Sequence, residues 1–418
     1  MDHRWPADVT LPAADLPLRE RLRLLCDYAR LAPSIRNSQP WRFVLHDDAV
    51  EVWAVRERAL PVADPDARGL TISCGAALAY LEIAARAASL ATTIERLPDP
   101  ATPDLLGRLQ VTGKAPPATE DPWFFQAIPK RRTHRGVYSG HPVSAGLLRR
   151  LEELAANAGT TLRILKGDDR QQLVELIKSA DRQQRQDPAF CTELATWVGP
   201  ELSGHRLGLP AHRIEASAIL AGEITRLRRF AGTVPEAPND DNDNDNDNDN
   251  DNNNDNNNND TPHIAVDLMI DDLDDLLSDD GAEKLRLLSV SRRAPESAAT
   301  GGRIPGIRPP SRPPPPDPTS DRELDSGIPV LAVLTTPSDD AKAWLVAGET
   351  LARVLLRGRV DHLWASFFGQ VIEVASARAT LHTHLGADAW PQVVLRLGYA
   401  GDLAPTPRRA LSCQLNEA

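Results

Sequence analysis

The most constraining feature of this chain is an interior segment, residues 239–325, whose composition opposes folding. It begins with a long run of Asp and Asn from Asn239 to Asp260, and it ends in a proline-rich stretch, residues 303–318. Carboxylate and amide side chains offer no apolar surface, so nothing offsets the entropy that the backbone loses on ordering. We therefore expect a long disordered insertion, and the blocks on either side of it must supply the fold.

The negative charge of the chain is concentrated in this insertion. The 418 residues carry a formal net charge of −12, whereas residues 239–325 alone hold 22 acidic and 8 basic side chains, a balance of −14. The remainder is close to neutral and has no stripe of Lys and Arg, so we expect no nucleic-acid partner. The insertion is either a surface loop that the fold tolerates or a calcium buffer or docking tail.

The rest of the composition is that of a protein with a large core. Hydrophobic residues make up 41% of the chain, and its four cysteines are widely spaced without a CxxC pair. The N-terminus has no apolar signal segment, and no run of about 18 apolar residues occurs anywhere. We expect a cytoplasmic protein that does not enter a membrane.

The first block predicts helices around a hairpin. Apolar residues recur at helical spacing over 19–32, and Pro33 ends that helix. Strands near 42–46 and 50–55 follow, and an alanine-rich helix over 73–89 is expected to be central. The second block alternates helices and strands in the same way. Its expected elements are a helix at 144–158, a strand at 161–165, helices through about 230, a strand at 328–336, a helix at 341–360 and a strand at 391–399.

Two segments share one pattern. Residues 74–95 and 347–368 both open with a small residue and a glycine, and both continue as long helices with apolar residues at helical spacing. Together with the two-cycle order of the chain, this similarity suggests an internal duplication. A duplicated chain encloses by itself the cleft that a two-fold dimer forms from two subunits.

The string APSIRNSQPWRF, residues 32–43, is dense in hydrogen-bonding side chains. Ser34, Asn37 and Gln39 lie between two prolines that stiffen the loop, and Trp41 anchors its end. A rigid loop rich in donors suits a polar planar ligand. A plain Asn/Ser turn beside a buried tryptophan is the alternative.

Two arginine-rich strings indicate an anion. Arg131 to Arg135, RRTHR, brings three guanidinium groups and a hydroxyl together, and the planar fork of arginine matches phosphate oxygens. Arg408 and Arg409 follow the last predicted strand and either complete a phosphate site or cap the surface. A solvated basic turn is the alternative for RRTHR.

Other motifs give little support to a different chemistry. No GxGxxG follows a strand, so a Rossmann nicotinamide fold is not indicated. His382 and His384 have no Cys or carboxylate cluster nearby in sequence, so we expect no metal site. Cys74 is interpreted as a packed core thiol, and no side chain is nominated as a catalytic residue.

Together, the three strings resemble the nitroreductase family. Residues 32–43 resemble its APS-x-x-N-x-QPW-x-F loop, RRTHR resembles its RRS-x-R element, and LRLGY with PTPRR resembles its closing strand and basic tail. In this chain the loop precedes RRTHR, whereas within one copy of the ordinary nitroreductase fold the arginine-rich element comes before the loop. With ISCGAAL and the WLVAGE helix, that order resembles the Acg-type FMN-binding oxidoreductases, which are fused forms of the homodimeric fold. The likeness covers residues 20–230 and 326–412.

The resemblance implies an α+β fold duplicated in one chain, with mixed sheets flanked by helices and one FMN between the halves. The residues that match the family's cofactor-binding positions come from four segments. For the phosphate they are Arg131, Arg132, Thr133 and Arg135, from RRTHR, and Arg408 and Arg409, from the basic tail. For the flavin they are Ser34, Asn37 and Gln39, from the loop, and, with a weaker match, Ser366 and Gln370 near the ring. Arg36 stands where this branch often has His, and Phe367-Phe368 replace Pro-Leu, and both changes bear on access to the flavin.

The expected domains are residues 1–127 as the first half and residues 128–238 with 326–418 as the second half, interrupted by the insertion. We expect a monomer with pseudo-dimer architecture. The implied activity passes electrons from NAD(P)H through FMN to a nitroaromatic or quinone-like acceptor. The alternatives are an FMN store or sensor, whose cleft residues 187–213 would cover, and a scaffold acting through the insertion.

Overall fold

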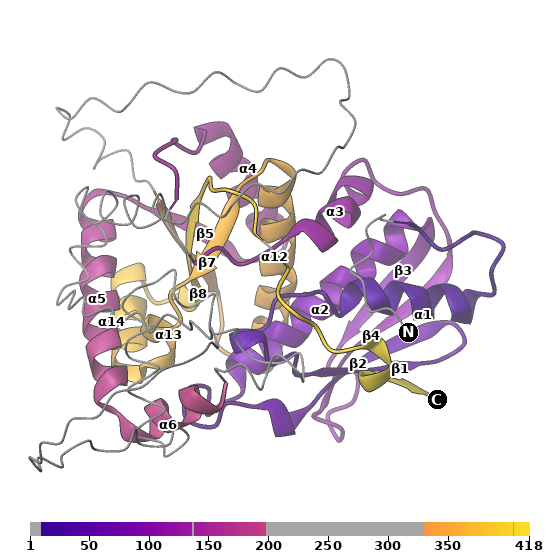
Figure 1. Cartoon of the computed structure of the whole chain (residues 1–418), viewed down its shortest axis with the longest axis horizontal. Helices are drawn as coiled ribbons and strands as arrows, with labels where there is room; N and C mark the ends of the chain where they lie inside the picture. Colours follow the sequence, from indigo (N-terminus) through magenta and orange to yellow (C-terminus); the bar gives the residue numbers. More distant parts are fainter. Residues whose placement is uncertain (1–9, 136–137, 198–328, 404) are drawn as a thin grey trace, which may run out of the picture.

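The computed structural model describes residues 10–135, 138–197, 329–403 and 405–418 (Figure 1). The insertion at 239–325 lies outside the described residues, as do the helices expected between 198 and 230. The described chain forms two sheets with helices around them, one sheet in each half of the molecule. The α+β class expected from the sequence is confirmed.

The first sheet is mixed, and its strand order is β3-β4-β2-β1-β9. Its pairs are antiparallel except for β1 and β9, which run parallel. Buried and partly exposed residues alternate along β1, so one face of the sheet packs on the core and the other is partly open. The strands are β1 (Trp41–Leu45), β2 (Ala49–Ala54), β3 (Leu90–Arg96), β4 (Leu105–Lys114) and β9 (Leu415–Glu417).

The second sheet is antiparallel and buried on both faces. Its order is β5-β6-β8-β7. In β6, Ala332 and Leu334 face one apolar cluster, while Leu331 and Val333 face another. Helices on both faces explain why this strand is continuously apolar in the sequence. The strands are β5 (Thr161–Leu165), β6 (Val330–Thr336), β7 (Trp364–Phe367) and β8 (Trp390–Gly398).

Helices cover both sheets, and short helical turns join them. Those of the first half are α1 (Leu18–Ala29), η1 (Ile35–Asn37), η2 (Arg56–Arg58), α2 (Arg68–Ala87), α3 (Asp121–Ala127) and η3 (Ile128–Lys130). Those of the second half are α4 (Ala145–Asn157), α5 (Gly167–Gln186), α6 (Pro188–Thr196), α12 (Ala341–Val360), α13 (Gln370–Glu373) and α14 (Ala375–Leu385), and η5 (Leu411–Cys413) lies near the C-terminus.

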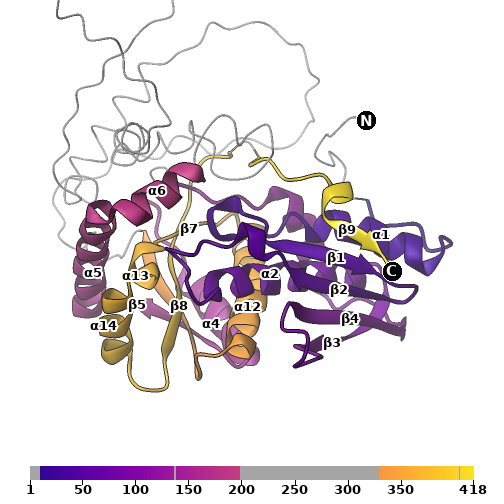
Figure 2. The ribbon, with the colours of Figure 1, turned by 90° about the horizontal axis from the view of Figure 1, so that it is seen from below.

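The helices α2 and α12 pack against each other between the two sheets (Figure 2). Two glycines allow this approach. A Cβ on Gly75 would overlap the carbonyl oxygen of Leu345, and a Cβ on Gly348 would overlap the carbonyl oxygen of Ile72. The contact is reciprocal, because each glycine contacts the residue that lies three positions before the other glycine in the sequence. These are the two glycines that the sequence repeat brings into register.

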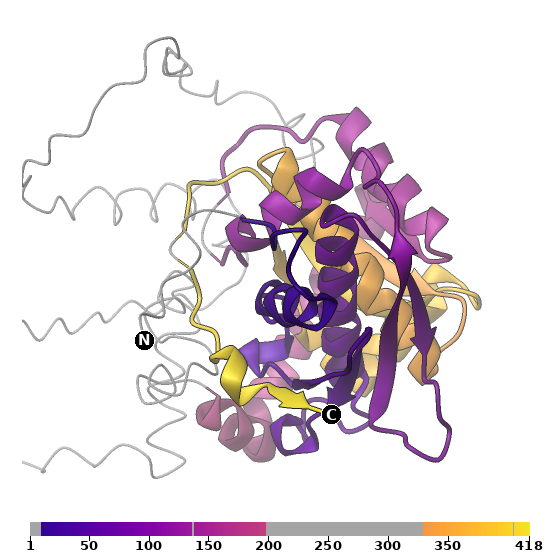
Figure 3. The same cartoon turned by 90° about the vertical axis from the view of Figure 1, so that its right-hand side faces the viewer.

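The C-terminal segment does not stay in the second half. Residues 405–418 run along the outside of the molecule, and β9 adds to β1 as the end strand of the first sheet (Figures 2 and 3). The strand β9 therefore belongs to the sheet of the first half. The physical reason is that β1 would otherwise present unpaired backbone groups, which β9 covers.

One described helix, α2, is long and apolar enough by composition to cross a membrane. In the protein 89% of its apolar window is buried. The central position expected from its alanine content accounts for this apolar character.

Candidate functional site

A cavity of about 320 Å³ lies between the two halves, next to the crossing of α2 and α12. Both halves line it. The first half contributes Ser34, Ile35, Arg36, Arg68, Gly69 and Ile72, and the second contributes Thr133, Arg135, α5 and α6 side chains, Leu351, residues 367–370, Ile372, Glu373 and residues 392–394. Its volume and mixed apolar and polar lining are those of a site for a small organic ligand.

The loop at 34–39 has an unusual backbone shape. Arg36, Asn37 and Gln39 all have positive φ angles, of 46°, 56° and 48°. Such conformations cost energy in residues other than glycine, and they persist only where the surroundings enforce them. Here Ser34 Oγ accepts from the backbone N–H of Gln39 at 3.0 Å, and the Gln39 side chain accepts from the backbone N–H of Arg409 at 2.9 Å. These two hydrogen bonds hold the loop in its strained shape beside the cavity.

Beside the same loop lies a cluster of buried arginines. Arg131 is 5% exposed and Arg408 is 7% exposed. Arg408 donates to Asn37 Oδ1 at 2.7 Å and to the backbone carbonyls of Leu31 and Ala32. Burial lowers the pKa of Arg408 well below its usual value, and Arg131 and other arginines nearby lower it further.

No described carboxylate forms a salt bridge with Arg131 or Arg408. Their Nε atoms, and the hydroxyl of the buried Tyr80, have no hydrogen-bond partner within the described part of the chain. Burying a guanidinium without an opposite charge is unfavourable. The cluster therefore has the properties of an anion site, since a bound phosphate would neutralise the charge and accept the remaining hydrogen bonds.

The helix α6 forms one wall of the cavity through Phe190, Cys191 and Leu194. Its Glu193 is fixed from several directions. The carboxylate accepts from the backbone N–H groups of Val62 and Ala63, at 2.7 and 3.1 Å, and from Arg36 at 3.0 Å.

Arg36 extends this connection to the second half. Its other terminal nitrogen donates to Glu373 at 3.1 Å, and its guanidinium lies 4.9 Å from the ring centre of Phe190. Arg36 thus links the strained loop, α6 and α13 around the cavity.

We expect Glu193→Gln to loosen α6. The neutral amide loses the charge-assisted bonds to Arg36 and to the two backbone amides, a loss of about 1.5–3 kcal/mol for a hydrogen bond to a charged group. Hydrogen exchange of the α6 amides should accelerate about tenfold or more, while exchange in β6 stays unchanged. Glu175→Gln, at an exposed position on α5, is the control. Equal α6 exchange in both variants would contradict this role.

No protein-family model matches the chain. A Mycobacterium tuberculosis protein with the provisional name NAD(P)H nitroreductase is 28% identical over 420 residues, 99% of this chain and 95% of the relative. An uncharacterized protein of that organism is 26% identical over 393 residues, 92% of this chain and 89% of the relative. A third, provisionally named NAD(P)H nitroreductase acg, is 28% identical over 200 residues, 48% of this chain and 59% of the relative.

The first match spans nearly the full length of both chains, and the acg match places the similarity within one branch. These similarities support a place for the chain among the Acg-type nitroreductases. The match to a solved structure, the FMN-dependent nitroreductase NfnB from Mycobacterium smegmatis in complex with NADPH, covers 70% of this chain and 96% of that one, at 16% identity and a TM-score of 0.30.

In the structure the predicted site residues fall into two adjoining groups. Ser34, Thr133, Arg135 and Gln370 line the cavity. The others lie at or near the arginine cluster. They are Arg131, Arg132, Asn37 and Arg408 in the cluster itself, with Gln39 and Arg409 in the contact that fixes the strained loop.

Ser366 is the predicted residue whose position differs most from the expectation. It is buried in β7 and does not line the cavity. Its hydroxyl accepts from Arg396 Nε at 2.5 Å and from the Tyr138 hydroxyl at 3.2 Å. These two contacts hold the Ser366 hydroxyl behind the cavity wall.

Sequence reasoning missed several residues of the candidate site. Arg68, Glu373 and Phe190 line the cavity, and Tyr80 lies in the arginine cluster. Arg68 stands at the start of the helix that contains ISCGAAL, so an arginine opening a buried helix was the available signal. The other three carried no distinguishing pattern.

The histidines considered for a metal have other partners. His382 stacks on Trp390 with ring centres 3.8 Å apart, and His384 lies 3.2 Å from Asp169. The described residues contain no group of three or more His, Cys, Asp or Glu able to hold a metal ion.

Proposed function

We propose that this protein is an FMN-dependent oxidoreductase that takes electrons from NAD(P)H and passes them to a nitroaromatic or quinone-like acceptor. The observation that carries the proposal is the pairing of a buried, uncompensated arginine cluster with a cavity between the halves. Two of the relatives described above are named as NAD(P)H nitroreductases, which supports the same activity.

The residues present fit FMN on physical grounds. Arg131 and Arg408 supply two buried cations without carboxylate partners in the described chain, which suits a phosphate. The cavity, which Ser34 and Thr133 line, has both apolar walls and polar side chains, which suits a ring system with hydrogen-bonding edges. The strained loop belongs to both groups, because Ser34 lines the cavity and Asn37 contacts Arg408.

When bound, FMN supplies the ring that accepts two electrons from a nicotinamide and releases them to an acceptor. The protein's own residues bind and orient. Arg131, Arg132 and Arg408 hold the phosphate, and Ser34, Thr133 and Gln370 present polar groups to the ring. Phe190 and Leu194 on α6 exclude water from the cavity. No side chain is assigned a proton transfer.

A flavin store or sensor with little turnover is the second candidate. The position of α6 on the cavity wall favours it, since Glu193 fastens that helix. The described α6 is part of the segment 187–213 that the sequence suggested as a cover, and residues 198–213 lie outside the described chain.

The architecture is part of the same proposal. We infer a duplicated chain with one FMN site, acting as a monomer in the cytoplasm. The reciprocal contact of Gly75 and Gly348 supports the duplication, because it is the contact that a two-fold axis would produce between two copies of one helix.

An anaerobic titration of the FMN-loaded protein with NADPH, and then with NADH, tests the proposal. We expect either nicotinamide to bleach the flavin absorbance band rapidly, and added menadione or a nitroaromatic to restore it. A flavin that dithionite bleaches and neither nicotinamide affects would favour the store. Failure to take up FMN would reject both.

A further inference from the structure

Arg68 is a buried cation on the cavity wall that the proposed function has not used. It lies in the first turn of α2, is 8% exposed, and lines the cavity. No described carboxylate forms a salt bridge with it. Burial and the nearby Arg378 lower the pKa of Arg68 to about 10, so the side chain is still protonated at neutral pH.

The carboxylates closest to Arg68 are engaged by other donors. Asp64 accepts from the backbone N–H groups of Gly69 and Leu70, both at 2.8 Å, where it caps α2. Glu373 accepts from Arg36 at 3.1 Å and from Gln184 at 2.8 Å. Neither carboxylate neutralises Arg68.

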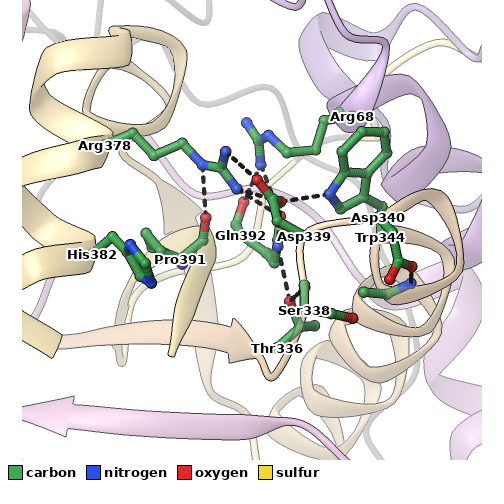
Figure 4. Close-up of polar contacts among 12 residues, drawn as sticks. Arg68, Thr336, Ser338, Asp339, Asp340, Trp344, Arg378, His382, Pro391 and Gln392 are labelled. Atoms are coloured by element: carbon green, nitrogen blue, oxygen red, sulfur yellow. Dashed lines mark hydrogen bonds and ion pairs between the residues drawn. The ribbon is translucent and has the colours of Figure 1, made fainter. Parts of the chain in front are cut away.

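The third carboxylate, Asp339, is paired still more firmly (Figure 4). Both of its oxygens accept from Arg378, at 2.7 and 2.8 Å, and one also accepts from Trp344 Nε1 at 2.7 Å. These donors hold the pKa of Asp339 far below its usual value although partial burial opposes them.

Arg68 is nevertheless held in one orientation. Its Nη1 donates to the backbone oxygen of Gln392 at 2.8 Å and lies 3.3 Å from that residue's Oε1. Gln392 is itself fixed, because its Nε2 donates to Thr336 Oγ1 at 2.8 Å and to Asp339 at 3.1 Å. Both contacts between Arg68 and Gln392 use the Nη1 nitrogen of Arg68 (Figure 4). Its Nε and Nη2 have no partner in the described chain and are not enclosed by it.

We propose that Arg68 is the anion-binding residue of the cavity, and that its Nε and Nη2 bind a negatively charged oxygen on the planar ring system that occupies it. This inference rests on the proposed function. A rigid, protonated guanidinium with two donors left over matches a carboxylate or an enolate oxygen. Such an oxygen has two possible sources, which are the flavin after it takes up electrons and an acidic aromatic acceptor.

Arg68→Gln in the FMN-loaded protein tests the inference with two readouts. One is the flavin midpoint potential, measured by spectroelectrochemical titration. The other is the Kd of benzoate, a carboxylate probe, measured from the shift of the flavin absorbance band, with neutral benzamide as its matched ligand. Glutamine removes the charge but keeps a donor for the carbonyl oxygen of Gln392.

Each outcome either supports or overturns the inference. If the flavin is the source, the potential falls by about 30 mV or more, which is a tenfold change for a two-electron couple. If an acidic acceptor is the source, the Kd of benzoate rises roughly 10- to 100-fold and that of benzamide is unchanged. An unchanged potential together with an unchanged preference for benzoate overturns it.

Controls separate this result from misfolding and from failure of the proposed function. Arg163→Gln removes a partly exposed, paired arginine outside the cavity and should change neither readout. Arg68→Met is the second variant, used if the glutamine variant unfolds in a thermal scan. If the wild-type chain takes up no FMN, the proposed function fails. Calorimetric titration of the flavin-free protein with benzoate and benzamide then tests Arg68 alone, and equal affinities in wild type and variant overturn the inference.

Discussion

Gly348→Ala is expected to lower the stability of the protein by about 3 kcal/mol, the upper end of the usual cost of overpacking, because the added methyl group meets backbone and cannot be accommodated by a side-chain rotation. It would overlap the carbonyl oxygen of Ile72 and approach the backbone nitrogen of Ala76. The two central helices would have to separate. Thermal unfolding followed by circular dichroism should show a Tm lower by roughly 6–12 °C.

The same helix provides the control for this prediction. A Cβ on Gly358 would lie 3.6 Å from Leu363, an ordinary contact. Gly358→Ala should therefore leave the Tm unchanged or raise it, since alanine is favoured over glycine in a helix by about 0.5–1 kcal/mol. Gly75→Ala should behave like Gly348→Ala because the contact is reciprocal. Equal Tm values for the substitutions at 348 and 358 would disprove the close crossing.

Replacing Arg131 with methionine should have opposite effects on ligand binding and on folding. The variant loses a charge-assisted phosphate contact, so FMN affinity, measured by fluorescence titration, should fall about 10- to 150-fold. The flavin-free protein should be as stable as the wild type or more stable. It loses a buried positive charge that is near Arg408 and has no salt bridge to a described carboxylate.

This pair of readouts distinguishes a binding residue from a structural one. A structural arginine would lower the stability of the flavin-free protein when removed and would affect FMN binding only through that loss. Arg56→Met is the control, since Arg56 is exposed and paired with Asp104 at 2.7 Å. Full FMN occupancy with unchanged affinity in the Arg131 variant would show that the phosphate is not bound at the arginine cluster.

The sequence predicted the elements whose pattern is local. The helix at 341–360 has the predicted bounds, and the strand at 161–165 does too. The two strands of the hairpin were predicted within one residue, because the polar pair Asp47-Asp48 separates two apolar strand segments in the sequence. Short elements such as β7 and β9 were missed, since four or three residues carry too little periodicity and form strands only because a neighbouring strand pairs with them.

The candidate site was predictable where a segment carried several polar residues together. The loop at 34–39 and RRTHR do lie together, which their separation in sequence does not reveal. An arginine that opens a buried helix was a local signal for Arg68, but its proposed role was not predictable, because that role depends on which carboxylates around it are already paired. The pairing of these carboxylates is set by segments that are distant in sequence and meet only in the folded protein.

The pairing of β9 with β1 has a consequence for synthesis on the ribosome. The first sheet receives its end strand only after residues 415–417 are made, and at usual rates of synthesis β1 is without this partner strand for on the order of tens of seconds. During that interval its outer edge is open to pairing with another nascent chain. A tag or fusion attached after Ala418 would act directly on this step, whereas one attached at the N-terminus would not.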